Sequence, residues 1–238
     1  MFIASPVSVL TGDAARVALE TTNDAAYLTP GKGVLSVPLE RWQQAQQYER
    51  DTWLTYGLSA TEDRNAEHAA LFDHYQALPE KLGAVIELGC GPFTNVREIL
   101  SRDHTTKSKV ITLVDPLAKT YQEQHPNCAY KDGKLHGLIA MLEPKAIEDY
   151  ATDITFDTLI MVNVLSHCRD AARVFERIHY LLRKGGYLVF GEPARDIDPE
   201  QLYDVGHPLS YTQAVIDEFL SDFKEKYRNG NYFIGVKK

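Results

Sequence analysis

Basic residues are scarce in this sequence relative to acidic ones. The 238 residues include 25 Lys and Arg against 33 Asp and Glu, a formal net charge of -8. Nucleic acids and anionic membrane surfaces are bound mainly through clustered Lys and Arg, which replace counterions. The charge therefore argues against nucleic acid and membrane as partners, although it leaves room for a local basic groove.

Cysteines and long hydrophobic runs are also few. The three cysteines, Cys90, Cys128 and Cys168, are scattered and odd in number, which suits reduced thiols better than a disulfide framework. No two of them have zinc-ligand spacing, so no metal is expected. No apolar run approaches the roughly 20 residues that span a bilayer, and the N-terminus lacks the basic region of a secretory signal. We expect a cytoplasmic protein.

The first 80 residues are expected to form an N-terminal helical layer, a cap or lid. Residues 38–54 contain no Gly or Pro after Pro38 and predict a helix, and residues 61–77 predict a second one, capped by Ser59 or Thr61. Four polar or aromatic side chains share one face of the first helix by their spacing. They are Trp42, Gln46, Glu49 and Trp53. This face is either packed in the core or closed over a ligand.

From residue 81 onward, apolar strand patterns alternate with helical ones. Strands are predicted at 84–88, 109–115, 145–149, 156–165 and 186–193, and helices at 95–101, 116–124 and 170–184. Asn95 and Glu98 have the spacing of a capping box. Strand and helix in alternation predict a parallel sheet with helices on both faces.

The end of the chain breaks this alternation. Residues 211–223 predict a helix, and Asn229-Gly230 between two strand-like runs predicts a β-hairpin. The predicted fold is α/β: a three-layer α-β-α sandwich with a mostly parallel seven-stranded sheet ending in an antiparallel hairpin, plus the N-terminal helical layer. The core is expected over 81–238, with a candidate acceptor-binding insertion at 194–212.

A glycine turn follows the first core strand. Glu87, Gly89 and Gly91 stand in the stretch "VIELGCGPFTN", and Asp115 ends the next strand. Two glycines allow close approach of a ligand, and an acid at the next strand tip can bind ribose hydroxyls. A dinucleotide fingerprint would need a third small residue where Phe93-Thr94 stands, and Glu87 would be unfavourable beside a pyrophosphate. A cofactor with an amino group and a sulfonium but no phosphate fits better, namely S-adenosylmethionine (SAM).

Four stretches in order resemble the motifs of class I SAM-dependent methyltransferases. They are "VIELGCGPFTN", "TLVDP", "FDTLIMVNVLSH" and "LLRKGGYLVFGEP", spread over residues 84–193. The resemblance implies SAM as cofactor and S-adenosylhomocysteine (SAH) as product. The N-terminal helix also resembles a segment that precedes this core in some bacterial enzymes.

The resemblance also implies a set of cofactor-binding residues. Glu87, Gly89, Cys90 and Gly91 would form the methionine-binding loop, with the acid acting through water or the loop backbone. Asp115 would bind the ribose, and Pro116 or Leu117 would line the adenine. Ile147 and Glu148 would address the adenine edge, with Asp149 as the alternative acid. Asn163 and Val164 would border the sulfonium.

Two histidines are candidates for a catalytic base, because imidazole titrates near neutral pH. His167 follows the fourth-strand motif, where it is alternatively a packing residue. His207 lies in the segment 202–212, where it is alternatively an ordinary loop residue. The predicted activity is methyl transfer to an oxygen or nitrogen of a small molecule or saccharide, and a homodimer is compatible with the sequence. The alternatives are a non-catalytic SAM-fold domain that acts through a protein partner, and a nicotinamide-linked dehydrogenase.

Overall fold

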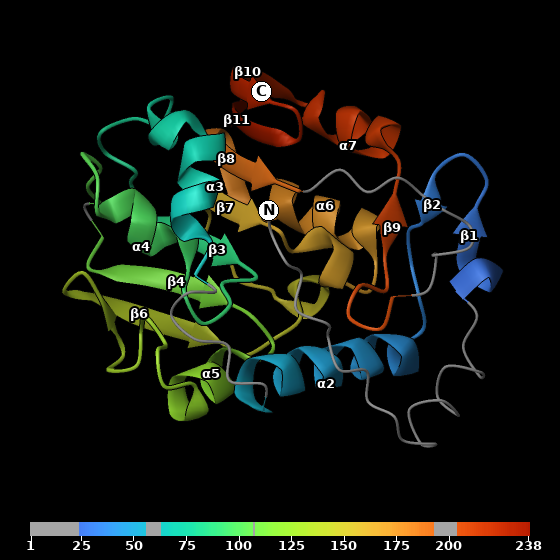
Figure 1. Ribbon diagram of the computed structural model, residues 1–238. Helices are drawn as coiled ribbons and strands as arrows, with labels where there is room; N and C mark the ends of the chain where they lie inside the picture. Colours follow the sequence, from blue (N-terminus) through green and yellow to red (C-terminus); the bar gives the residue numbers. More distant parts are fainter. Residues whose placement is uncertain (1–23, 56–62, 107, 193–203) are drawn as a thin grey trace, which may run out of the picture.

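An eight-stranded sheet forms the centre of the computed structural model, which describes residues 24–55, 63–106, 108–192 and 204–238 (Figure 1). Its spatial order is β10-β11-β8-β7-β3-β4-β6-β5. The five inner strands run parallel, whereas β5, β10 and β11 add antiparallel edges. The strands are β3 (Val85–Leu88), β4 (Val110–Val114), β5 (Lys134–Leu135), β6 (Leu138–Glu143), β7 (Phe156–Val162), β8 (Leu182–Gly191), β10 (Phe223–Asn229) and β11 (Tyr232–Lys237).

Helices cover both faces of this sheet, and each face has its own apolar core. Ile86 and Leu159 pack in one core, whereas their strand neighbours Val85 and Ile160 pack in the other, because successive side chains of a strand point to opposite faces. The first core includes residues of α6 (Ala171–Leu181) and α7 (Gln213–Leu220), and the second includes residues of α3 (Asn65–Leu71), α4 (Asn95–Leu100) and α5 (Ala118–Gln124). The predicted three-layer sandwich is confirmed.

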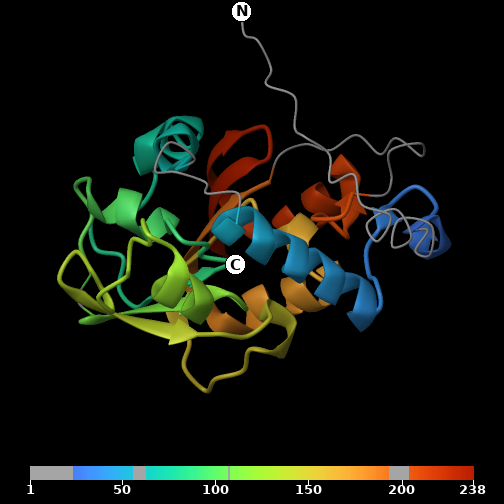
Figure 2. The same ribbon diagram turned by 60° about the horizontal axis from the view of Figure 1, so that its bottom comes forward.

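The helix α2 (Leu39–Thr55) crosses the carboxyl ends of the strands (Figure 2). Near its start, the Trp42 indole Nε1 donates to the carbonyl of His167, beyond β7, at 3.1 Å. Near its end, the Trp53 ring meets Phe93, beyond β3, with 5.8 Å between ring centroids. The helix predicted at 38–54 is confirmed, and its aromatic face is turned to the strand ends.

A small second sheet fastens the N-terminal segment to the C-terminal half. β2 (Gly33–Val34) pairs with β1 (Leu28–Thr29) on one side and with β9 (Ser210–Tyr211) on the other. Before β1, η1 (Asp24–Tyr27) begins with a buried acid. The N-terminal layer is thus joined to the core by backbone pairing as well as by side chains.

The strand predicted at 145–149 is wrong. Residues there form the 3-10 helix η4 (Ile147–Asp149), and the strand is β6, several residues earlier. β6 leaves Ile139 54% and Met141 38% exposed, so it lacks the continuous burial that makes an inner strand conspicuous in a sequence. With β5 beside it, the sheet has eight strands in the described residues where seven were predicted.

The helix predicted at 61–77 is shorter than expected. α3 ends at Leu71, and positive φ angles at Asp73, His74 and Tyr75 break the path through η3 (Asp73–Tyr75). Phe72 and Tyr75 are fully buried and stack at 5.2 Å between centroids, so the turn places both rings in the core. The caps suggested at Ser59 and Thr61 lie outside the described residues, as do residues 194–203 of the suggested insertion.

The C-terminal hairpin is confirmed, with its turn displaced by one residue. Asn229 pairs with Tyr232, so the two-residue loop is Gly230-Asn231, and Gly230 has a φ of +58°. Among the described residues, no helix combines the length and apolar character needed to cross a membrane.

Candidate active site

A cavity of about 350 Å³ lies at the carboxyl ends of β3, β4 and β7, beneath α2. This volume is in the range of small-molecule sites, and the position is the one at which open α/β sheets bind ligands. Most residues that the sequence nominated line it: Gly89, Cys90, Gly91, Asp115, Pro116, Ile147, Glu148, Asn163, Val164, His167 and His207. Glu87 does not.

The glycine turn after β3 needs glycine at both positions, for different reasons. Gly89 has a φ of +69°, and a Cβ there would lie 2.3 Å from Cγ1 of Val164. Gly91 has a φ of +52°, but a Cβ there would meet no atom within 4 Å. Gly89 therefore allows the turn to pack against the tip of β7, whereas Gly91 keeps open a space beside the cavity.

Glu87 lies beneath the turn and stabilises it from the protein side. Its buried carboxylate accepts from the backbone amides of Asn95 at 2.8 Å and Val96 at 3.2 Å, and from the Thr94 hydroxyl. Burial raises the pKa of Glu87, and these hydrogen bonds oppose the rise. The capping box predicted from Asn95 and Glu98 is not formed, because Glu87 supplies the acceptor at the start of α4. Any effect of Glu87 on a ligand passes through the loop.

Asp115 joins the tip of β4 to the glycine turn. Its Oδ2 accepts from the Gly91 amide at 3.0 Å, and its Oδ1 accepts from the Leu117 amide at 2.8 Å. The residue is 9% exposed and lines the cavity. Burial raises the pKa of the carboxyl, and the two amide hydrogen bonds oppose that rise. A carboxylate fixed at both oxygens is thus presented to the cavity.

Of the two acids in η4, only Glu148 lines the cavity. Its Oε1 accepts from the amides of Arg169 at 2.6 Å and Asp170 at 3.0 Å, which fixes the start of α6. Asp149 has a largely exposed side chain that pairs with the Arg169 guanidinium at 3.2 Å. Of the two acids that the sequence left as alternatives, Glu148 is therefore the one placed beside the cavity.

The segment after β7 is held by an acid at the end of β8. Glu192 is fully buried, and its Oε1 accepts from the amides of Val164 and Leu165, both at 2.7 Å. Its Oε2 accepts from the Tyr211 hydroxyl at 2.8 Å. Glu192 thereby links the cavity wall at Val164 to β9 of the small sheet.

The two candidate histidines lie side by side with a carboxylate from α2. The rings of His167 and His207 are 4.3 Å apart between centroids. His167 Nδ1 is 3.0 Å from the Gly206 carbonyl and 3.4 Å from Glu49 Oε1, and His207 Nδ1 is 2.8 Å from Asp204 Oδ2. Burial raises the pKa of Glu49, and the nearby His207 opposes the rise. Three segments distant in sequence thus bring acids and imidazoles to one wall.

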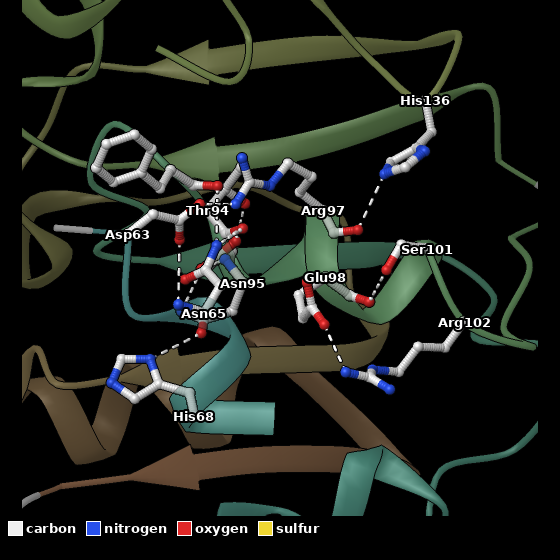
Figure 3. A network of polar contacts seen from close by, with 12 residues as sticks. Asp63, Asn65, His68, Thr94, Asn95, Arg97, Glu98, Ser101, Arg102 and His136 are labelled. Atoms are coloured by element: carbon white, nitrogen blue, oxygen red, sulfur yellow. Dashed lines mark hydrogen bonds and ion pairs between the residues drawn. The ribbon is translucent and has the colours of Figure 1, made fainter. Parts of the chain in front are cut away.

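The start of α3 contacts the loop that follows the glycine turn (Figure 3). Asn65 Nδ2 donates to the carbonyls of Phe93 at 3.1 Å and Thr94 at 2.7 Å, and His68 Nδ1 lies 3.2 Å from Asn95 Oδ1. Arg64, the residue before Asn65, is exposed and lines the cavity. Within the described part of the chain it is the only Lys or Arg that does so.

Comparison with known proteins shows the family to which this chain belongs. Residues 60–221 match the family described as a methyltransferase domain. The chain belongs to that family. A curated relative, described as an uncharacterized 37.1 kDa protein of transposon Tn4556 from Streptomyces fradiae, is 27% identical over 168 residues. The match covers 68% of this chain and 45% of the relative, so the chain spans less than half of that protein.

Solved methyltransferase structures share the fold. The N-methyltransferase NodS from Bradyrhizobium japonicum, in complex with SAH, has a TM-score of 0.52 at 17% identity, with 83% of this chain and 96% of that chain covered. A 1,6-didemethyltoxoflavin-N1-methyltransferase from Burkholderia thailandensis, also with SAH, has a TM-score of 0.54 at 17% identity, with coverage of 89% and 98%. The family and fold that the four sequence motifs predict are therefore confirmed.

Several residues of the methyltransferase site escaped the sequence analysis. Glu192 carried a signal, since it follows an apolar strand as Asp115 does, and strand-tip acids gather at one edge of a parallel sheet. Arg64 and Asn65 carried none, because nothing in their local pattern shows that they approach a loop nearly thirty residues away. The sequence placed Glu49 on a helix face that either packs in the core or closes over a ligand, but it did not show that Glu49 lies beside His167.

Proposed function

We propose that this chain transfers a methyl group from SAM to an oxygen or nitrogen of a small molecule or saccharide. The observation that carries the proposal is the hydrogen bond between the glycine turn and the strand-tip acid: the Gly91 amide donates to Asp115, and both residues line the cavity. The histidines on another wall of the same cavity add groups that can accept a proton.

The residues present fit SAM. The open space at Gly91 leaves room for a ligand against the turn, and the fixed Asp115 carboxylate suits ribose hydroxyls. Pro116, Ile147 and Glu148 would surround the adenine, and Asn163 and Val164 would border the sulfonium. Arg64 would bind the methionine carboxylate, because it is the cavity's one Lys or Arg in the described residues and precedes Asn65, which contacts the loop after the glycine turn.

Methyl transfer from SAM needs positioning more than acid–base chemistry, since the bound cofactor supplies a methyl group already activated by its sulfonium. The chain's contribution is to hold the acceptor in line, an effect for which effective molarities of about 10⁵ M or more are known. We propose that α2 acts as the lid of the site. Trp53 packs edge-on against Phe93 and Tyr121, and all three rings line the cavity.

An acceptor that must lose a proton has two bases within the cavity. The neighbours of Nδ1 in both histidines are acceptors, a carbonyl and a carboxylate at His167 and a carboxylate at His207. The proton of each neutral ring is therefore placed on Nδ1, and the lone pair is on Nε2. This is the tautomer in which Nε2 can act as a general base.

Calorimetric titration with SAM and SAH tests the proposal. We expect the wild type to bind both, and Gly89→Arg and Asp115→Ala to lose binding. Asp149→Ala is the matched control, because Asp149 is an exposed acid outside the cavity lining. A wild type that binds neither compound, or variants that bind as the wild type does, would contradict the assignment of the site.

A further inference from the structure

One wall of the cavity holds carboxylates and imidazoles. We call Glu49, His167, His207 and Asp204 the acid–imidazole wall; the first three line the cavity, and Asp204 bonds to His207 from behind. Arg64, the one Lys or Arg lining the cavity in the described residues, belongs to the segment that contacts the glycine turn instead. Of the four residues of this wall, the two whose charge is fixed, Glu49 and Asp204, are therefore acids.

The wall is assembled from separate segments, which hold its groups in place. Glu49 belongs to α2, and its second oxygen accepts from the Trp53 indole at 3.2 Å. Arg41, on the same helix, donates to the carbonyls of Asp204 at 2.6 Å and Val205 at 3.0 Å. The helix thus fixes both its own carboxylate and the segment that carries His207.

We propose that the acid–imidazole wall binds an amine acceptor that arrives as the ammonium ion; this rests on the proposed function. A carboxylate or phosphate group would be repelled by the Glu49 carboxylate, which lines the cavity. A neutral hydroxyl would bring no positive charge to the partly buried Glu49 carboxylate, whose removal from water is costly. An ammonium ion compensates it directly.

The burial of Glu49 supports this choice. Burial raises the pKa of the Glu49 carboxyl although His207 and the Trp53 indole stabilise its ionised form, so in the free protein desolvation outweighs these two contacts. A ligand cation would supply further stabilisation on binding. Glu49 would also bind the product, because a methylated amine is protonated and carries a positive charge as well.

The chemical step balances with groups already present. The ammonium ion loses one proton to Nε2 of His207, whose Nδ1–H is held by Asp204. The freed nitrogen lone pair forms a bond to the methyl carbon as the bond from carbon to sulfur breaks, and the electron pair of that bond stays on sulfur. The products are a methylated ammonium ion, neutral sulfur in SAH, and a His207 imidazolium that returns its proton to solvent.

Two matched series of acceptors test the inference. One consists of phenethylamine, 2-phenylethanol and phenylacetate, and the other of glucosamine, glucose and glucuronate. SAH release is measured for each, with SAH binding measured separately by calorimetry. We expect release with the amines at a rate at least about tenfold above that with the alcohols, and none with the acids.

Glu49→Gln separates recognition from folding, because it keeps the size of the side chain. It should raise KM for the amines about tenfold or more, as expected for a lost ion pair in a partly buried site, and leave the Kd for SAH within about twofold. Glu40→Gln is the control, an exposed acid on the first turn of α2 outside the cavity lining. It should change neither constant.

The outcomes are distinguishable. Transfer to alcohols or acids in preference to amines, an unchanged KM in Glu49→Gln, or no transfer to any compound by a protein that binds SAH would overturn the amine assignment. A protein that does not bind SAH would instead contradict the proposed function.

Discussion

Arg41 and Asp24 form an ion pair from which water is almost wholly excluded. The guanidinium Nε lies 3.1 Å from Oδ1 of Asp24, and the side chains are 0% and 1% exposed. Burial raises the pKa of Asp24, and the contact with Arg41 opposes the rise. Because the same guanidinium also holds the Asp204 and Val205 carbonyls, one buried cation connects the start of the described chain, α2 and the His207 segment.

Arg41→Met is expected to destabilise the protein by about 3–5 kcal/mol, because it leaves Asp24 buried without its cation. Urea unfolding measures the loss. Arg50→Met, which breaks a half-exposed pair with Asp51 on the same helix, should cost under about 1 kcal/mol. The double variant Asp24→Leu/Arg41→Met should regain much of the stability. Equal losses at the two arginines would show that the buried pair has no special role.

The two glycines of the turn should separate stability from binding. Gly89→Ala combines left-handed strain with a clash against Val164, so a loss of about 3 kcal/mol is expected in urea unfolding. Gly91→Ala carries only the strain, about 1–2 kcal/mol, but places a methyl group beside the cavity. This variant should still fold, but calorimetry should show weaker SAH binding than in the wild type. Wild-type affinity in Gly91→Ala would mean that the ligand does not approach this turn.

SAH affinity should fall as the pH is lowered from about 8 to about 5. Burial raises the pKa of Asp115, so its protonation begins at a higher pH than that of an ordinary carboxyl group. Protonation removes acceptor capacity that the ribose hydroxyls would use. Asp115→Asn should bind more weakly at the upper pH and lose part of the pH dependence, which controls for the histidines. If SAH affinity varied with pH in Asp115→Asn as it does in the wild type, the titrating group would be a residue other than Asp115.

Arg64→Ala should weaken SAH binding about tenfold, the change expected for about 1.4 kcal/mol of binding free energy. Affinity for 5′-methylthioadenosine, which lacks the amino-acid carboxylate, should stay the same. Comparing the two ligands in calorimetry isolates the carboxylate contact, with Arg50→Ala as a control on the outer surface. Equal weakening of both ligands would assign Arg64 to a general structural role.

Glu192→Ala is expected to cost about 1–3 kcal/mol, since it leaves the buried amides of Val164 and Leu165 without their acceptor. It should also reduce SAH affinity, because Val164 lines the cavity. Tyr211→Phe removes only the hydroxyl that donates to the other oxygen, and should cost about 1 kcal/mol with little change in SAH affinity. The reverse ranking in urea unfolding would refute the role given to Glu192.

The sequence predicted those parts of the site whose chemistry is local. Gly89, Gly91 and Asp115 stand at the ends of short apolar strands, and parallel strands bring such ends to one edge, so their meeting follows from the fold class. The roles of Glu87 and Glu192 did not follow in the same way. Each is a strand-tip acid, but its partners are backbone amides of a neighbouring loop, and a sequence does not show which amides lack acceptors.

The secondary structure that the sequence did not predict, namely β6 and the break after α3, has a similar explanation. β6 pairs with β4 although two of its side chains are exposed, so its backbone partners decide its structure more than its apolar pattern does. The break after α3 depends on Phe72 and Tyr75 finding places in the core, which outweighs the helical pattern of the segment. Tertiary contacts override local preference in both cases.

The pairing of β2 with β9 also affects how the protein is made. Val34 and Ser210 are paired although they stand 176 positions apart in the chain. During synthesis, the N-terminal segment leaves the ribosome long before its partner strand exists, and domains usually fold as their residues emerge. The small sheet can therefore be completed only after residues 210 and 211 have been translated. A nascent chain stalled ahead of residue 210 would hold the glycine turn and Asp115 but not β9, so the N-terminal segment could not yet be fastened to the C-terminal half by the small sheet.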